Sequence, residues 1–573
     1  MYLNALHNPF VYDDSRTIVE NVSVQSPGSF RAIVLHDITR PIVNLSYAAD
    51  RALWGAQPFG FHVTSVLLHM LNVVLLYQLA WRFADDLSPA SDGGRDSAKR
   101  AAARSAQSAM TARGPVVAST AAVLFAVHPM MTEAVGYISG RSEVLCATFF
   151  LLALMSGRRW LHGDGAIWAM LSIALWLVAL ATKEIAAMFP FVLACYDWLI
   201  APGNQVQKRR RMLTVHLPII TIAILAAVVR LTVFARVENA DPMMVRWPYV
   251  LLELDVVRRY LTLLLVPAGQ AMFHDVSLLK GVFDPRAILA IGVLGLMLAL
   301  AWRLRRIDGL ASFGILWFLL LLLPSSALVA LGHGEAMTEH RVYLASCGLF
   351  LAIGAGISHV WVRVTRLSAS ARLLARAVLA TGLVTLCALT VLRNVVWASP
   401  VTLWHEAVDR APDHWRPRLL LGEALQDNGR REEAVEQYKA ALRIRPAEPS
   451  AYMKLGLCFA EMGRLQEAAA TFQRLRDLDP RSAGASTGLG AVAMLQGQPD
   501  RARQYFLEAI ERDPRNVSAR RSLAILDEIE PANPAEALRL CQEIQQIAPQ
   551  TPGNDDCIRR NQARVNAIRA GRR

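Results

Sequence analysis

The chain has 573 residues, of which 54% are hydrophobic, and its mean hydropathy is +0.30. It is too long for one ordinary domain and too apolar for a soluble protein. The net charge of +13 could indicate nucleic-acid binding, but the sequence has no zinc knuckle, RNP-like motif or basic stripe with interleaved aromatic residues. Lys and Arg also accumulate in the cytoplasmic loops of membrane proteins, so we predict a polytopic membrane protein without a nucleic-acid partner.

Residues 1–10 form neither a signal peptide nor a membrane span, having no basic start and no long apolar run, and we expect residues 1–60 to form an extracytoplasmic loop. This loop contains two adjacent carboxylates, Asp13 and Asp14, ahead of a long series of apolar segments. Such a pair could hold the acid–base group of a membrane enzyme. The alternative is a solvated turn that caps the following helix.

Residues 61–400 are expected to form a polytopic membrane domain of about ten spans. The apolar segments, most of them near the 17–25 residues that a bilayer requires, are 61–81, 115–135, 143–157, 165–182, 185–201, 213–235, 286–302, 309–331, 342–362 and 377–397. Residues 82–113 are predicted to be a flexible loop. The segment 251–267 carries four charged residues and is expected to be an interfacial amphipathic helix.

Basic residues assign the two sides of the membrane. Five clusters fall at every second connection, where the positive-inside tendency predicts cytoplasm: 82–113, 158–159, 208–211, 303–306 and 363–376. The non-cytoplasmic side then receives Asp13 and Asp14 together with the segments 128–141, 183–184, 236–285 and 332–341.

Residues 412–550 contain a 34-residue repeat. Two sets of residues recur at this spacing: Gly422, Gly456 and Gly490, and Pro446, Pro480 and Pro514. Small residues where two helices approach, with Pro after the second helix, are typical of tetratricopeptide repeats. We expect three clear repeats and a degenerate fourth around 518–549. The repeats should lie on the non-cytoplasmic side, followed by a flexible basic tail at 551–573.

The cysteines give no diagnostic spacing. Cys541 and Cys557 could form a disulfide if the C-terminal region faces an oxidising compartment. The sequence has no CxxC motif or His/Cys cluster that would suggest zinc, and we predict no metal site.

Six motifs in one order resemble a known family: FVYDD at 10–14, TRPIVNLSYAADRALWG at 39–55, PFGFHVTSVLLHMLN at 58–72, HPMMTEAVGYISGRSE at 128–143, ATKE at 181–184 and EHRVYLAS at 339–346. With the repeats, they resemble the transmembrane and TPR-containing protein O-mannosyltransferases and their bacterial relatives, of the GT-C class of glycosyltransferases. The resemblance implies an all-α fold, in which a GT-C-like transmembrane helix domain precedes a tetratricopeptide α-solenoid. Members of the family begin with a span before the acidic loop, and we expect that span to be missing here because the start site is placed too late or the chain is a fragment.

The resemblance also implies site residues. Asp13 would be the catalytic base, and Asp14 would support it or bind sugar. Donor-phosphate contacts would come from Arg141, Lys183 and Arg341, since Arg and Lys bind phosphate well. The alternative is that these cations snorkel or pair with Glu143, Glu184 and Glu339. Possible supporting residues are His128, Glu133, Glu184, Glu339 and His340, although His128 could simply end a helix.

The expected function is an inverting transfer of a sugar such as mannose from a polyprenyl-phosphate donor to Ser or Thr of a protein held by the repeats. No cofactor is predicted, because the lipid-linked sugar is a substrate, although some GT-C enzymes use a divalent ion. The acceptor could instead be a glycolipid or cell-wall glycan. The chain could also be a non-catalytic scaffold whose repeats dock a partner protein. In a bacterium, the site and the repeats would face the periplasm from the inner membrane.

Overall fold

The computed structural model describes the chain except for residues 26–28, 88–112, 238–246, 331–334, 367, 530–532, 550 and 572–573, and it does not describe the side chains of 230–237 and 327–330. The described residues form helices and irregular segments without a strand, so the fold is all-α. They divide into two compact units, Met1–Ser399 and Pro400–Arg573.

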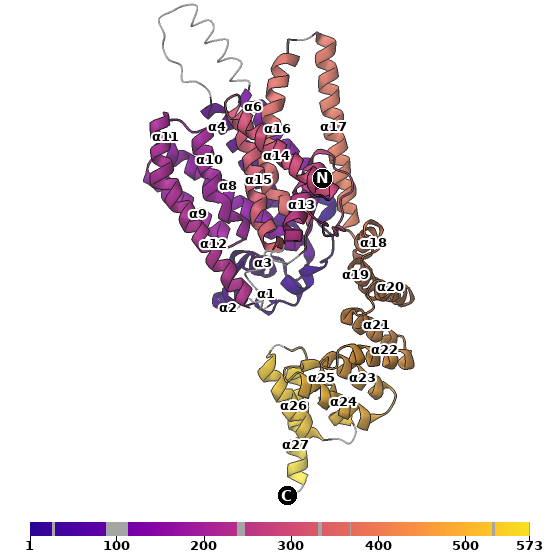
Figure 1. The fold of residues 1–573 in the computed structure, drawn as a ribbon. Helices are drawn as coiled ribbons and strands as arrows, with labels where there is room; N and C mark the ends of the chain where they lie inside the picture. Colours follow the sequence, from indigo (N-terminus) through magenta and orange to yellow (C-terminus); the bar gives the residue numbers. More distant parts are fainter. Residues whose placement is uncertain are drawn as a thin grey trace, which may run out of the picture. The chain divides into compact units, whose positions relative to one another are not determined.

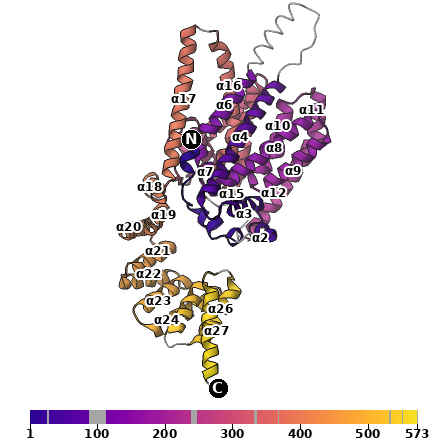
Figure 2. The ribbon, with the colours of Figure 1, turned by 180° about the vertical axis from the view of Figure 1, so that it is seen from behind.

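The first unit begins with short helices, of which α1, α2 and α3 lie at one end of a helical bundle (Figures 1 and 2). They are η1 (Tyr2–Ala5), η2 (Ser15–Val19), α1 (Val22–Gln25), α2 (Phe30–His36) and α3 (Pro41–Trp54). Pro41 and Pro58 stand at the first positions of α3 and of the next helix, where a missing backbone N–H costs nothing.

The bundle follows in chain order. Its helices are α4 (Pro58–Asp86), α6 (Arg113–Val127), η3 (Pro129–Met131), α7 (Thr132–Gly136), η4 (Ile138–Gly140), α8 (Arg141–Leu161), α9 (Ala166–Leu180), η5 (Glu184–Met188), α10 (Phe189–Leu199), α11 (Gln205–Arg211), η6 (Met212–His216), α12 (Leu217–Val237), α13 (Trp247–Leu265), α14 (Pro285–Leu304), α15 (Gly309–Ala330), η7 (Glu339–Val342), α16 (Tyr343–Val364) and α17 (Ala369–Val396).

Seven described helices are long and apolar enough to cross a membrane, and the pair Arg113–Val127 and Pro129–Gly136, bent by 58°, would make an eighth. The protein is therefore a membrane protein. The seven are Pro58–Asp86, Ile138–Leu161, Gln205–Val229, Pro285–Leu304, Gly309–Ser326, Glu339–Val364 and Ala369–Val396. Two of the ten expected segments correspond to shorter helices, α9 and α10, so the count of about ten spans stays a prediction.

Helix α13 occupies the segment expected to be amphipathic. It packs against α14 and α15 and buries Glu253 and Asp255. Asp255 forms ion pairs with Arg258 and Arg259 along the same helix, at 2.7 and 2.9 Å. These ion pairs within the helix compensate the charge of Asp255 where it is buried against the bundle.

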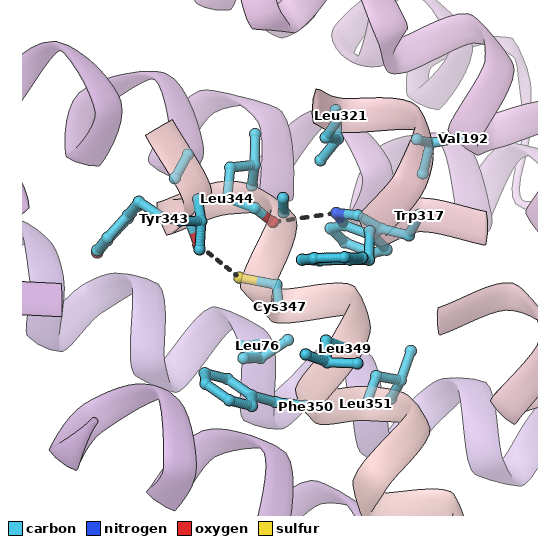
Figure 3. Packing of buried hydrophobic residues seen from close by; sticks show 14 of the residues in the cluster. Leu76, Val192, Trp317, Leu321, Tyr343, Leu344, Cys347, Leu349, Phe350 and Leu351 are labelled. Carbon is cyan, nitrogen blue, oxygen red and sulfur yellow. Dashed lines mark hydrogen bonds between the residues drawn. The ribbon is translucent and has the colours of Figure 1, made fainter. Parts of the chain in front are cut away.

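The core of the first unit lies among α4, α6, α8, α15 and α16. Trp317 is fully buried there, and its indole N–H donates to Leu344 O at 3.1 Å (Figure 3). Helices α15 and α16 approach closely because Gly314 and Gly348 face each other; a Cβ on Gly348 would lie 2.6 Å from Gly314 O. This contact positions the start of α16 and with it the preceding turn η7.

The second unit contains successive helix pairs. Its helices are α18 (Pro400–Arg410), α19 (Trp415–Asp427), α20 (Arg431–Ile444), α21 (Pro449–Glu461), α22 (Leu465–Leu478), α23 (Ala483–Leu495), α24 (Pro499–Arg512), α25 (Val517–Ile529), α26 (Pro534–Ile547) and α27 (Asn554–Gly571). A Cβ on the repeated glycine Gly456 would lie 2.7 Å from the Phe472 ring, which explains a small residue there. Gly422 and Gly490 face Tyr438 and Phe506 in the same way.

The C-terminal segment differs from the expected flexible tail. Residues 554–571 form α27, which packs against α26. A disulfide joins Cys541 of α26 to Cys557 of α27. The cross-link and the packing order a segment whose composition alone suggested a tail.

Candidate functional site

Loops from distant parts of the first unit are held together by specific contacts. The Tyr12 hydroxyl donates to Glu335 Oε1 at 3.0 Å, which joins the acidic loop to the segment before η7. Backbone N–H of Ile42 donates to Ala181 O at 3.4 Å, which joins the start of α3 to the segment before η5. Asp13, Asp14 and Lys183 lie on these loops, and Glu184, Glu339, His340 and Arg341 lie in the short helices η5 and η7 that follow them.

Asp14 is buried and serves to position the acidic loop. Its side chain accepts hydrogen bonds from Val11 N–H at 3.1 Å, Ser139 N–H at 2.8 Å and Ser139 Oγ at 2.6 Å. Burial raises the pKa of Asp14 to about 7, although the hydrogen bonds from Ser139 and Val11 oppose this shift. Asp14 therefore ties the loop to η4.

Asp13 presents its side chain to the surface. Its backbone is held on both sides, because its N–H donates to Tyr137 Oη at 3.2 Å and its carbonyl accepts from Thr17 Oγ1 at 2.8 Å. The preceding Tyr12 has φ +52°, a conformation that a residue with a side chain rarely adopts. A strained turn fixed by hydrogen bonds thus holds Asp13 with its carboxylate accessible.

Arg141, expected to contact a phosphate, is fully buried. Its guanidinium pairs with Asp50 at 2.5 Å and donates to Phe61 O at 2.6 Å. It also lies over the Tyr47 ring, 5.0 Å from the centroid. Glu143, the alternative partner expected for Arg141, forms an ion pair with Lys183 instead. In this structure Arg141 links α3, α4 and α8, and its charge is compensated inside the bundle.

Lys183 and Glu184 do not pair with each other. Lys183 Nζ contacts Glu143 Oε1 at 2.7 Å, and its side chain is 6% exposed. Glu184 contacts Arg40 at 3.6 Å. The side chain of Arg40 is 40% exposed, and it adds a cation that the sequence reasoning missed. The available signal was its place in the motif at 39–55, immediately before the proline that begins α3.

The turn η7 brings together two carboxylates and two imidazoles. Glu133 accepts from His340 Nδ1 at 2.6 Å and from Glu339 N–H at 3.0 Å. Glu339 in turn accepts from Ala271 N–H at 2.8 Å and contacts His274 Nε2 at 3.0 Å. His274 was not nominated by the sequence, since it lies in a segment without a motif.

Arg341 remains partly accessible, with Nη1 donating to Ala336 O at 3.3 Å. It does not form an ion pair with Glu339, whose side chain is directed to Ala271 and His274. Arg341, Lys183 and Arg40 all act electrostatically on His340.

His128 has a structural role. Its Nδ1 accepts from Met130 N–H at 3.2 Å and its Nε2 contacts Leu264 O at 3.1 Å. It therefore caps η3, in agreement with the alternative that it ends a helix.

Three basic residues, Lys183, Arg341 and Arg40, all act electrostatically on His340. The contact of Tyr12 with Glu335 ties the Asp13 loop to the segment that leads to Arg341. Guanidinium and ammonium groups in such a cluster suit a phosphate. Within the described ranges, no group of three or more His, Cys, Asp or Glu side chains has a geometry that would hold a metal ion.

Comparisons with known proteins bear on the repeats and on the family resemblance. Tetratricopeptide family models match residues 401–449, 419–483 and 459–526. The protein O-mannosyl-transferase Tmtc1 of Drosophila melanogaster is 25% identical, with 79% of this chain and 61% of the relative covered. The protein O-mannosyl-transferase TMTC4 of Homo sapiens is 26% identical, with 75% and 63% covered. The chain thus spans less than two thirds of the length of these relatives. The resemblance to protein O-mannosyltransferases that the motifs indicated is confirmed.

Among solved structures, the crystal structure of MamA is 22% identical, covers 26% of this chain and 87% of its own, and has a TM-score of 0.24.

Proposed function

We propose that this protein is an integral-membrane glycosyltransferase, of the GT-C type, that moves mannose from a polyprenyl-phosphate donor to Ser or Thr of a protein. One observation carries the proposal: the accessible carboxylate of Asp13 lies on a loop that is hydrogen-bonded to the segment leading to Arg341. Arg341, Lys183 and Arg40 are called the cation cluster below. The printed names of the curated relatives support the reaction class.

The reaction assigns a step to each group. The acceptor hydroxyl oxygen attacks the sugar C1 from the face opposite the phosphate, and its proton passes to the Asp13 carboxylate. The bond between C1 and the phosphate oxygen breaks, and its electron pair leaves with the polyprenyl phosphate, so the configuration at C1 inverts. Lys183, Arg341 and Arg40 stabilise the phosphate as its negative charge grows.

The sequence assigned Arg141 to the donor phosphate, and the proposal now gives that place to Arg40. Arg141 is enclosed and compensated by Asp50, whereas Arg40 is partly exposed and belongs to the cation cluster. Asp14 is a positioning residue that keeps the strained turn at Tyr12 in place.

The second unit is proposed to hold the protein acceptor, and both the site and the repeats are proposed to face the non-cytoplasmic side. The disulfide between Cys541 and Cys557 supports this side, because disulfides persist in oxidising compartments. Tetratricopeptide units bind extended peptides, and the relatives' names specify a protein acceptor.

The test is transfer of labelled mannose from polyprenyl-phosphomannose to protein in membranes that contain the full chain. Asp13→Asn should lower the rate by about 100-fold or more, since a general base contributes that much. Asp164→Asn, which changes an exposed carboxylate between α8 and α9, is the matched control and should keep the wild-type rate. Equal rates for Asp13→Asn and wild type would refute the assignment of Asp13. Labelled product found in lipid alone would show a glycolipid acceptor.

A further inference from the structure

A hollow of about 440 Å³ between α4 and α8 has no part in the mechanism above. It is lined by two arginines, two aromatic rings, an amide and a carboxylate: Arg82, Arg158, Tyr77, Trp81, Gln78 and Asp85. All of them except Arg158 belong to the last turns of α4, one of the helices that are long and apolar enough to cross a membrane. Trp and Tyr side chains favour the level of a bilayer where acyl chains meet head groups. The hollow therefore lies at this boundary.

Arg158 is held in the wall of this hollow by Asp86. Its Nε and Nη2 donate to the Asp86 carboxylate at 2.7 and 2.5 Å, and the same carboxylate accepts the Tyr196 hydroxyl at 2.7 Å. The Asp86 side chain is 3% exposed, so this ion pair is enclosed on the side of Asp86. The two N–H groups of Nη1 take no part in the pair. Arg158 thus keeps hydrogen-bond donors for a ligand, although its charge is already compensated.

Arg82 and Asp85 leave one positive and one negative charge uncompensated in the hollow. In the part of the chain that the structure describes, neither side chain forms an ion pair, although the two residues stand three positions apart on α4. A simple anion would compensate Arg82 but would be repelled by Asp85, and a simple cation would have the reverse effect. A ligand with one phosphate and one ammonium group compensates both side chains.

The face of α4 that carries part of this lining continues toward the middle of the helix as an apolar stripe. The stripe consists of Leu67, Leu71 and Val74, whose side chains are all exposed. The next positions of the same face, at intervals of three or four residues, include Gln78 and Asp85. Acyl chains can pack along the stripe while a head group occupies the hollow. A ligand that fits both parts is amphipathic, with a zwitterionic head group and apolar chains.

We propose that the hollow binds the head group of an aminophospholipid such as phosphatidylethanolamine. Arg82 and Arg158 donate hydrogen bonds to the lipid phosphate, and the primary ammonium donates to Asp85. The trimethylammonium group of phosphatidylcholine has no N–H to donate, and phosphatidylglycerol has no positive charge for Asp85. The basic residues that assign this end of α4 to the cytoplasm place the bound lipid in the cytoplasmic leaflet. The inference is independent of the proposed reaction.

The experiment measures lipid binding to the full chain by native mass spectrometry, with phosphatidylethanolamine, phosphatidylcholine and phosphatidylglycerol of identical acyl chains. Wild type should bind one phosphatidylethanolamine about tenfold more tightly than either other lipid. Asp85→Asn should abolish this preference, because it removes the charge that meets the ammonium. Arg82→Gln should weaken the binding of all three lipids at this site by about tenfold, because all three carry the phosphate.

The matched control is Arg159→Gln, which should keep the wild-type affinities. Arg159 is the neighbour of Arg158 on α8, but its guanidinium lies over the Trp168 ring, 4.1 Å from the centroid, and it does not line the hollow. Equal wild-type affinities for the three lipids, or an Asp85→Asn protein that still prefers phosphatidylethanolamine, would overturn the inference.

Two further outcomes would identify a different occupant of the hollow and its stripe. Glycerophosphoethanolamine, the head group without acyl chains, should compete at least about 100-fold less well than the lipid, because it cannot cover the apolar stripe. Equal competition would contradict lipid binding and indicate a soluble phosphate ester. A wild-type chain that is dimeric without bound lipid, and that Leu71→Asp makes monomeric, would assign the stripe to a second copy and overturn the inference.

Discussion

Asp14 is enclosed by Val11 and Ser139, whereas the side chain of the neighbouring Asp13 is exposed. Adjacent residues in a chain point in different directions, so a pair of carboxylates can divide into one that positions the loop and one that meets the substrate. Burial favours the neutral form of Asp14 and sets its pKa near 7, well above that of an aspartate in an unfolded chain.

The raised pKa of Asp14 predicts a pH dependence of stability. Between about pH 4 and about pH 7 the folded protein binds more protons than the unfolded chain, so stability falls as pH rises, by up to about 1.4 kcal/mol per unit. Thermal unfolding of the purified protein in detergent should show a midpoint that decreases across this range. Asp14→Asn should remove much of the decrease, and Asp37→Asn is a control with another aspartate of the same loop region. A midpoint with the same pH dependence in Asp14→Asn would contradict the assignment.

Arg141 illustrates the opposite case, a charge that is entirely internal. Arg141→Met leaves Asp50 buried without its partner, and we expect a loss of about 3–5 kcal/mol in unfolding free energy. The double variant Arg141→Met, Asp50→Asn should recover much of that loss, as measured by the thermal midpoint. Donor binding by the folded double variant separates the two roles: affinity close to wild type supports a structural role, and lost affinity would support the phosphate contact predicted from the sequence.

At the scale of elements, the site depends on how closely α15 and α16 pack, because η7 leads directly into α16. Gly314 and Gly348 permit backbone contact between the two helices. Any side chain at Gly348 would meet both Gly314 O, at 2.6 Å from the Cβ position, and the Trp317 side chain, at 2.7 Å. The position of Arg341 thus depends on the packing of α15 and α16, although neither helix contains Lys183, Arg341 or Arg40.

Gly348→Val should destabilise the protein by about 1–3 kcal/mol through overpacking and should reduce transfer activity. Gly356→Ala is the matched control on the same helix, since a Cβ there meets nothing within 4 Å and alanine favours the helix by up to about 1 kcal/mol. Thermal midpoints and transfer rates of the two variants, each compared with wild type, test whether the contact between α15 and α16 supports stability and activity. A Gly348→Val protein as stable as Gly356→Ala would mean that the contact is looser than described.

At the scale of the whole molecule, the proposal assigns acceptor binding to the second unit and chemistry to the first. In the second unit α19, α21, α23 and α25 contact one another in succession, and three of them expose Leu457, Leu495 and Ile525. First helices of tetratricopeptide pairs line the concave surface of such arrays, and we propose that these exposed side chains contact an extended acceptor polypeptide.

Removal of residues 400–573 should therefore raise the KM for a protein acceptor by about tenfold or more, while kcat for a short Ser- or Thr-containing peptide changes by less than about twofold. Leu495→Asp in the intact chain should raise the same KM without removing the unit. Equal KM values for the protein acceptor with and without the second unit would contradict acceptor binding there and would favour docking of a different partner.

The sequence by itself determined the all-α class, the apolar helices and the tetratricopeptide period, because these follow from local and periodic patterns of apolar, small and breaker residues. It also placed Asp13 ahead of the first apolar segment, and Lys183 and Arg341 near the ends of apolar segments, where their motifs stand. Only the tertiary structure decided which partner each charge has. Lys183 uses Glu143 rather than Glu184, Arg141 uses Asp50, and His340 uses Glu133.

These pairs join residues 40 to 207 positions apart in the chain. Whether a side chain is buried or exposed, and which opposite charge lies within reach, depends on helices that meet only after folding. For the same reason the sequence could not show that Asp14 is buried while Asp13 is exposed, or point to Arg40 and His274. Motif spacing records neighbours along the chain, whereas the chemistry of a site is set by neighbours in space.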